Sequence, residues 1–107
     1  MDVRHYTYRV IWSNEDSEFV GLCTEFPSLS WLAPSMEGAL SGVVALVERV
    51  VADMQANAEP IPDPIGTRHF SGKFQVRTTP ERHRALATQA AEAGVSINRW
   101  VNDRLAG

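Results

Sequence analysis

The chain has 107 residues, of which 44% are hydrophobic and 21% charged, and its net charge is −3. This length allows one domain or two small ones, and the composition is ordinary for a soluble globular protein. The longest apolar helical stretch is interrupted by Gly42, Glu48, Arg49 and Asp53, which excludes a span of about 18 uninterrupted apolar residues. The single cysteine excludes an intrachain disulfide, and the N-terminus has no apolar stretch typical of a secretory signal, so we expect a cytoplasmic protein.

The charge is unevenly distributed along the chain. Residues 69–107 contain six basic and three acidic residues, which gives +3, whereas residues 1–68 contain four basic and ten acidic residues, which gives −6. A basic segment beside an acidic body suggests two different tasks. The basic part suits a polyanion such as nucleic acid, and the acidic part suits a basic protein partner.

The N-terminal part of the chain predicts a β-hairpin. Residues 5–14 alternate as a strand does, with Tyr6, Tyr8, Val10 and Trp12 on one face. Residues 14–18 form a polar turn, and residues 19–23 predict the second strand. Residues 26–32 form a loop, and the sequence does not decide whether this loop contains a short third strand.

Residues 35–55 predict the longest helix. Ser35 is a suitable N-cap, and Glu37 favours the positive end of the helix dipole. Its apolar stripe is predicted to consist of Met36, Leu40, Val43, Val47, Val50 and Met54. A second stripe of small residues, Gly38, Gly42 and Ala45, predicts close packing on the sheet of the hairpin.

Prolines at positions 60, 62 and 64 favour an extended, semi-rigid connector after this helix. Pairing of this segment onto the edge of the N-terminal sheet is the open alternative. The expected organisation is therefore an N-terminal domain over residues 1–58, a connector over residues 59–71 and a C-terminal domain over residues 72–107. The expected fold class is α+β.

The C-terminal domain predicts one strand followed by two short helices. The strand covers residues 73–78, Thr79 caps the first helix with Pro80 in its first position, and Gly94 ends that helix. Ser96 caps the last helix. This order is typical of a ribbon-helix-helix unit, in which a lone strand buries one face only by pairing with a second copy. The predicted core of that homodimer consists of Phe74, Val76, Leu86, Ile97, Trp100 and Val101.

The same segment predicts two kinds of DNA contact. Lys73, Gln75 and Arg77 share the other face of the strand, where they would contact bases in the major groove. Free backbone N–H groups at the start of the last helix would bind a phosphate, with the contacts supplied by Ser96, Ile97, Asn98 and Arg99. The simpler alternative is a plain strand on a basic surface.

Two segments resemble the C-terminal half of HicB-type antitoxins from toxin–antitoxin pairs. They are residues 71–87 (Ser-Gly-Lys-Phe-Gln-Val-Arg-Thr-Thr-Pro-Glu-Arg-His-Arg-Ala-Leu-Ala) and residues 93–101 (Ala-Gly-Val-Ser-Ile-Asn-Arg-Trp-Val). The N-terminal part is similar more loosely, through residues 25–29, residues 33–39 and the prolines at 60 and 62. Ser28 and Ala33 depart from that pattern, because the family usually has glycines there.

The resemblance implies a partial ribonuclease-H-like β-β-β-α-β unit that masks a small basic toxin ribonuclease of the HicA type. It also implies that the C-terminal unit represses the promoter of the pair. The assembly would be a homodimer or a tetramer in which N-terminal domains pair across ribbon dimers. We expect the toxin contact at Glu25, Phe26 and Trp31. A stand-alone repressor without a toxin is the alternative.

The sequence does not favour an enzyme. The acidic residues that could bind metal ions are interpreted as a solvated surface; they are Glu15, Asp16, Glu18, Glu25, Glu37 and Glu48. Cys23 is interpreted as a small buried apolar residue, and His5, His69 and His83 have no paired metal-ligand spacing. We therefore expect no catalytic residue, no metal and no cofactor, with a hydrolase as the weakest alternative.

Overall fold

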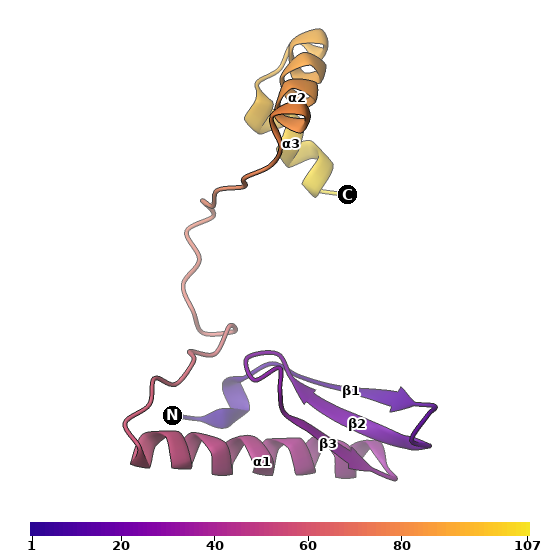
Figure 1. Cartoon of the computed structure of the whole chain (residues 1–107), viewed down its shortest axis with the longest axis vertical. Helices are drawn as coiled ribbons and strands as arrows, with labels where there is room; N and C mark the ends of the chain where they lie inside the picture. Colours follow the sequence, from indigo (N-terminus) through magenta and orange to yellow (C-terminus); the bar gives the residue numbers. More distant parts are fainter. The chain divides into compact units, whose positions relative to one another are not determined.

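The computed structural model describes residues Met1 to Gly107 and divides them into two compact units, Met1–Phe70 and Ser71–Gly107. The first unit contains a three-stranded sheet and one long helix, and the second contains two helices (Figure 1). The predicted α+β class is confirmed.

The sheet is antiparallel, with the strands in the order β1 (Tyr8–Ser13), β2 (Glu18–Cys23) and β3 (Ser30–Ala33). The third strand, which the sequence left open, is present. β1 begins later than predicted because Val3–His5 form one turn of 3-10 helix before it.

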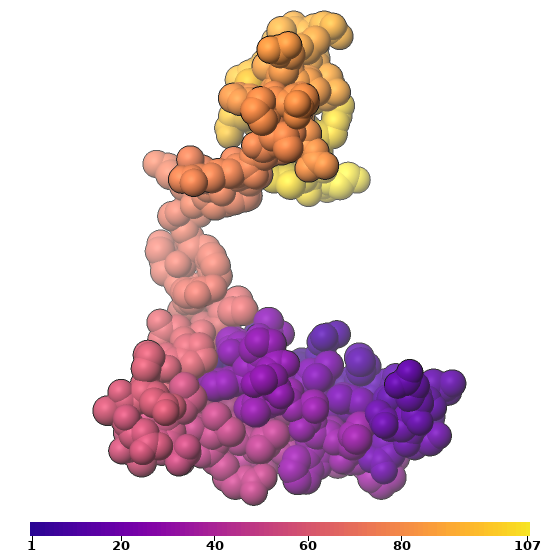
Figure 2. Space-filling model, viewed as in Figure 1, coloured from indigo at the N-terminus to yellow at the C-terminus, as the bar shows by residue number.

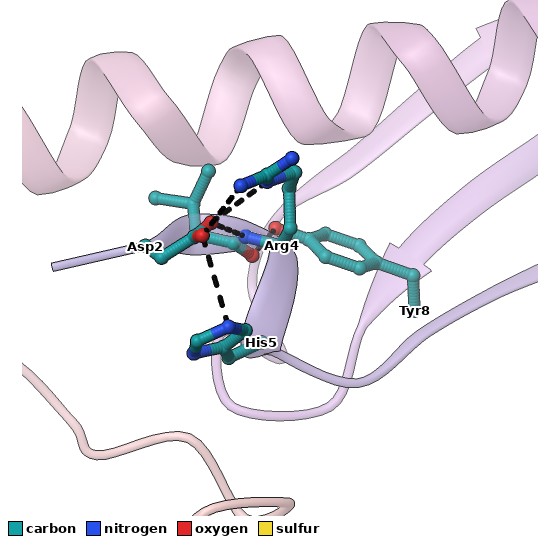
Figure 3. A network of polar contacts seen from close by, with 5 residues as sticks. Asp2, Arg4, His5 and Tyr8 are labelled. Carbon is teal, nitrogen blue, oxygen red and sulfur yellow. Dashed lines mark hydrogen bonds and ion pairs between the residues drawn. The ribbon is translucent and has the colours of Figure 1, made fainter.

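Asp2 holds that turn in place (Figure 3). Its carboxylate accepts hydrogen bonds from the backbone N–H of Arg4 at 2.9 Å and from the Arg4 guanidinium at 2.8 Å. These bonds keep the pKa of Asp2 well below its ordinary value. The hydroxyl of Tyr8 donates to the carbonyl of Val3 at 2.7 Å, which joins the turn to the first strand.

The helix α1 (Met36–Ala56) covers one face of the sheet (Figure 1). Ser35 is its N-cap, as predicted, and its hydroxyl accepts a hydrogen bond from the N–H of Gly38 at 3.0 Å. The predicted apolar stripe is wrong at its N-terminal end, because Met36 is 55% exposed and Leu40 is 44% exposed. The buried face of the helix consists of Ala39, Val43, Val47 and Val51.

Two glycines explain why small side chains face the sheet. A Cβ on Gly21 of β2 would overlap the backbone carbonyl of Ala39, and a Cβ on Gly42 would overlap the indole ring of Trp31. The helix therefore approaches the strands so closely that alanine and valine fill the space between them. This confirms the predicted close packing at Gly42.

Replacing Gly21 with alanine is expected to lower the free energy of unfolding by about 1–3 kcal/mol, because the new methyl group displaces backbone rather than a flexible side chain. Urea denaturation followed by circular dichroism measures the effect. Gly66→Ala is the matched control, since its Cβ would lie at an ordinary 3.6 Å from the carbonyl oxygen of His5. Equal stability of the two variants would contradict the close approach of α1 to β2.

The core of the first unit lies between the sheet, the N-terminal turn and α1. One cluster of this core consists of Val3, Tyr6, Cys23, Phe26, Val47 and Val51, and Ala33, Ala39 and Val43 are buried as well. Tyr6 and Phe26 pack edge to face, with ring centroids 5.2 Å apart. Cys23 is buried in this core, and burial raises the pKa of its thiol.

The first part of the proline-rich segment after α1 is attached to this core, and the segment belongs to the first unit as far as Phe70 (Figure 2). Pro64 is buried, Ile61 packs against the core, and the Tyr6 hydroxyl donates to the carbonyl of Pro62 at 2.7 Å. The fourth strand implied by the family resemblance is not formed in this segment. Its prolines lack the N–H groups that a strand ladder requires.

The second unit consists of α2 (Pro80–Ala93) and α3 (Ile97–Leu105). Both helices begin where the sequence predicts, and α2 also ends where it predicts. The hydroxyl groups of Thr79 and Ser96 accept hydrogen bonds from N–H groups of the first turns, and Gly94 ends α2 with a φ of +70°. Local side-chain chemistry is sufficient to set these boundaries.

Residues 73–78, predicted as a strand, have no strand pairing in the single chain. Phe74 is 76% exposed and Val76 is 70% exposed. The physical reason is that a strand is defined by hydrogen bonds to a neighbouring strand, and the second unit contains no other strand. The predicted ribbon therefore requires a second copy of the chain.

Candidate nucleic-acid interface

An apolar groove runs between residues 74–80 and the two helices of the second unit. It is lined by Phe74, Val76, His83, Leu86, Ile97, Val101 and Leu105, together with the polar and turn residues Arg77, Thr78, Thr79 and Pro80. Five residues predicted as dimer core therefore share one surface. Leu105, which follows Val101 by one helical turn on the predicted inner face of the last helix, lines the groove as well.

Trp100, the sixth predicted dimer-core residue, does not line this groove. Its indole N–H donates to the side-chain oxygen of Gln89 at 3.0 Å, and the guanidinium of Arg104 lies 3.8 Å from the ring centroid. The bond to Gln89 joins α3 to α2, whereas Arg104 lies on α3 itself. The place of Trp100 in the dimer core stays a prediction.

Of the three side chains predicted to contact bases, Arg77 lines the apolar groove itself. Lys73 and Gln75 line a second hollow, which they share with Asn98 and Asn102 of α3. Lys73 and Arg77 are exposed and form no ion pair, since the two ion pairs of the chain join Asp2 to Arg4 and His5. Their positive charges are therefore available to an anionic partner.

The start of α3 is exposed and has unsatisfied donors. The Ser96 hydroxyl accepts from the N–H of Arg99 at 3.0 Å, and the Ser96 carbonyl accepts from the N–H of Trp100 at 2.9 Å. The N–H groups of Ile97 and Asn98 have no acceptor in the first turn, because the chain before them turns away from the helix axis. Such a terminus favours an anion.

The residues predicted to contact a toxin lie in different surroundings. Phe26 is buried in the core of the first unit, whereas Trp31 is exposed beside Gly42. The Glu25 carboxylate accepts hydrogen bonds from the N–H groups of Thr7 and Ile65, both at 2.9 Å. Glu25 therefore links the end of β2 to the proline-rich segment.

The pKa of Glu25 reflects two opposing effects. Partial burial tends to raise the pKa, but the hydrogen bonds from Ile65 and Thr7 lower it, and the net shift is below the ordinary value. Because the pKa of Glu25 is lower in the folded chain than in the unfolded chain, its ionised form stabilises the fold. This stabilisation is fully present at pH values above the pKa of the unfolded chain, and it is lost as the pH falls through the folded-state pKa.

We expect the free energy of unfolding to decrease as the pH falls below about 4.5, and Glu25→Gln to flatten this decrease. Glutamine has one acceptor oxygen instead of two, so the variant should also lose about 1–2 kcal/mol at neutral pH. Denaturation curves recorded over a pH series measure both effects. Glu15→Gln, in the exposed β1–β2 turn, is the control. An unchanged pH profile for Glu25→Gln would show that this carboxylate does not hold the segment.

The structure contains no group of three or more His, Cys, Asp or Glu side chains placed to hold a metal ion. No helix combines the length and apolar character that crossing a membrane requires.

Comparison with known proteins gives one result. No curated protein and no solved structure showed a match to the chain. The model of the HicB family matches residues 56–105, from the last residue of α1 to the last residue of α3. The resemblance found in the sequence is therefore confirmed for this segment, which is HicB-like and contains the whole candidate interface.

Proposed function

We propose that this chain is an antitoxin that occludes a HicA-like toxin ribonuclease and also binds operator DNA as a dimeric autorepressor. One observation carries the DNA-binding half of the proposal. In the segment that matches the HicB family, Phe74 and Val76 are exposed beside an apolar groove that nothing in the chain fills.

Dimerisation would bury these side chains. Fully burying a side chain of this kind contributes about 1.5–3 kcal/mol, and a two-fold dimer buries Phe74 and Val76 of both copies. Pairing of residues 73–78 with the same residues of the second copy would also satisfy their backbone N–H and C=O groups. The burial of these apolar side chains and the pairing of the backbone groups both favour a two-stranded ribbon as the ordered form of residues 73–78.

The ribbon would present Lys73, Gln75 and Arg77 of both copies on its outer face. A two-stranded ribbon fits the major groove, where Arg and Lys pair with guanine and Gln pairs with adenine. The N-terminus of α3, with Ser96, Ile97, Asn98 and Arg99, would bind a backbone phosphate and fix the ribbon in position.

Binding to DNA is expected to weaken steeply with salt, because each phosphate neutralised by a basic residue releases counterions. With about six such contacts per dimer, affinity should fall roughly 10³-fold between 50 and 200 mM salt. Fluorescence anisotropy with labelled operator across a salt series measures the slope. A nearly flat dependence would contradict a phosphate-binding role for the basic second unit.

The toxin-binding half of the proposal rests on the family match and on charge. The first unit is acidic, with a charge of −6 over residues 1–68, and a small basic ribonuclease would complement it. Trp31 offers an exposed aromatic anchor. Glu25 and Phe26 would support this contact by holding the loop between β2 and β3.

Co-expression with the product of an adjacent reading frame tests this half. The proposal expects a small basic protein that co-purifies with the chain and whose ribonuclease activity is inhibited in the complex. The promoter-shift assay on the same complex tests the repressor function. Ribonuclease activity of the purified chain itself would instead support the hydrolase alternative.

A stand-alone repressor is the second candidate. It is favoured by the extent of the family match, which begins at residue 56 and leaves the sheet and nearly all of α1 unmatched. This candidate expects operator binding by the chain alone and no neighbouring reading frame for a small basic protein.

A further inference from the structure

His83 lies in the first turn of α2, on the face of the helix that lines the apolar groove. Its side chain is exposed in the single chain, and it shares the groove with Phe74, Val76 and Leu86. It precedes Leu86 by three positions and the buried Ala90 by seven, so the three residues lie on one face of α2. A residue type that changes charge between pH 5 and 8 therefore stands where the second copy of the proposed dimer packs.

The charged group that shares the groove with His83 is positive. Arg77 lines the groove, no carboxylate does, and α3 contributes only aliphatic side chains to it. On α2 itself, Arg82 and Arg84 are the neighbours of His83 in the chain. Glu81 lines a different hollow, two positions earlier on the helix. A proton on the imidazole would therefore add a second positive charge to the groove, with no carboxylate to balance it.

The helix dipole and burial act on His83 in the same direction. The backbone N–H of His83 donates to the carbonyl of Thr79 at 3.0 Å, which places this residue at the N-terminal end of α2. That end of a helix carries partial positive charge and disfavours a cation. A charge that is removed from water without a partner is disfavoured as well. The dipole, Arg77 and burial all favour the uncharged imidazole once the groove is filled.

We propose that His83 makes the C-terminal dimer, and operator binding with it, sensitive to pH. This pH dependence rests on the dimer of the proposed function, in which apolar side chains of the second copy cover the groove. In separate chains the imidazole faces water and takes up a proton as the pH falls. In the dimer the proton is excluded, so two chains associate only after each copy of His83 has released it.

The proton balance sets the sign of the pH dependence. Separate chains bind more protons than the dimer at the acidic end of the histidine range, so the dimer has its full stability above that range and weakens as the pH falls. Because two histidines are involved, the dimer dissociation constant rises by up to about 10²-fold for each unit of pH. The effect lies above about pH 4.5, below which the loss of the Glu25 carboxylate begins to weaken the first unit.

Sedimentation equilibrium of the full chain at about pH 7.5 and about pH 5.5 tests the proposal at constant ionic strength. The dissociation constant of the parent dimer should rise at least about tenfold between the two values. His83→Gln has an uncharged side chain at both, so its dissociation constant should change by less than about twofold. His83→Lys keeps a positive charge at both, so its dimer should be at least about tenfold weaker than the parent dimer already at the higher pH.

The other two histidines provide matched controls. His5 and His69 both belong to the first unit, outside the groove. His5→Gln and His69→Gln should therefore keep the full pH dependence of the parent chain. Circular dichroism of every variant at both pH values shows that α2 and α3 persist, which separates dissociation of the dimer from unfolding.

Operator binding gives a second measurement, in which a general charge effect has the opposite sign. Protonation of exposed histidines adds positive charge, which strengthens binding to DNA. Loss of the dimer through His83 weakens it. In anisotropy titrations the operator affinity of the parent chain should fall at least about tenfold from the higher to the lower pH, whereas that of His83→Gln should stay constant or rise.

Several outcomes would overturn the inference. They are a parent dimer of equal strength at both pH values, a pH dependence that persists in His83→Gln, and a His83→Lys dimer as tight as the parent dimer. In each case a dimer that binds the operator leaves the proposed function standing. A chain that is monomeric at both pH values and does not bind the operator would overturn the inference and the proposed function together.

Discussion

Replacing Val76 with aspartate is expected to abolish the dimer and operator binding with it. In the single chain Val76 is 70% exposed, so the substitution should leave both compact units folded. In the dimer the carboxylate would lie in the apolar groove beside Phe74, Leu86 and Ile97 of the two copies, where an unpaired charge is strongly destabilising. We expect dissociation at micromolar concentration and a loss of operator affinity of more than about 10³-fold, which corresponds to about 4 kcal/mol.

The neighbouring residue offers a sharp control. Gln75→Asp makes the same charge change on the other face of the segment, so it should weaken DNA binding and preserve the dimer. Sedimentation equilibrium gives the oligomeric state of both variants, and circular dichroism shows that α2 and α3 persist. Dimerisation of the Val76→Asp chain, or dissociation of the Gln75→Asp chain, would reverse the assignment of the two faces.

Replacing Arg77 with alanine is expected to weaken binding to the operator much more than binding to random DNA. A bidentate contact to a base contributes about 1–3 kcal/mol of discrimination, and the proposed dimer would present two such arginines. Operator affinity should therefore fall about 10²-fold or more. Affinity for random DNA should fall less, because the variant loses there only the attraction of two positive charges to the phosphates.

Arg99→Ala is the comparison for a residue assigned to phosphate. It should weaken binding to both DNAs by similar factors and reduce the slope of the salt dependence by about one unit per contact. Anisotropy titrations with operator and random duplexes at several salt concentrations separate the two behaviours. Equal losses on both DNAs for Arg77→Ala would mean that Arg77 contacts only phosphate.

The residues that the sequence placed correctly act over short distances. Ser35, Thr79 and Ser96 each bond to an N–H group three residues later, and Gly94 adopts a positive φ that other residues disfavour. These effects depend on a few neighbouring residues, so the helix boundaries could be predicted without knowledge of the rest of the chain.

Other features depended on contacts between distant segments. The face that α1 buries is set by Gly21 in β2 and by Trp31 in β3, which is why Leu40 lies outside the core although its spacing suits an apolar stripe. Glu25 bonds to Ile65, forty positions later, and thereby attaches the proline-rich segment to the first unit, a contact that no local pattern encodes. The indole N–H of Trp100 on α3 bonds to Gln89 on α2, eleven positions earlier, a contact that the spacing of the last helix did not predict.

The sequence by itself determined the α+β class, the caps of the helices, the end of α2 at Gly94, the uneven charge and the HicB-like character of the C-terminal segment. Each of these follows from local bonding or from composition. Only the tertiary structure decided which side of α1 is buried, where the proline-rich segment lies, and that Arg77 and His83 line one apolar groove with residues of α3. The reason is that strand register and helix approach are set by the simultaneous packing of segments far apart in the chain, and no local pattern encodes their relative positions.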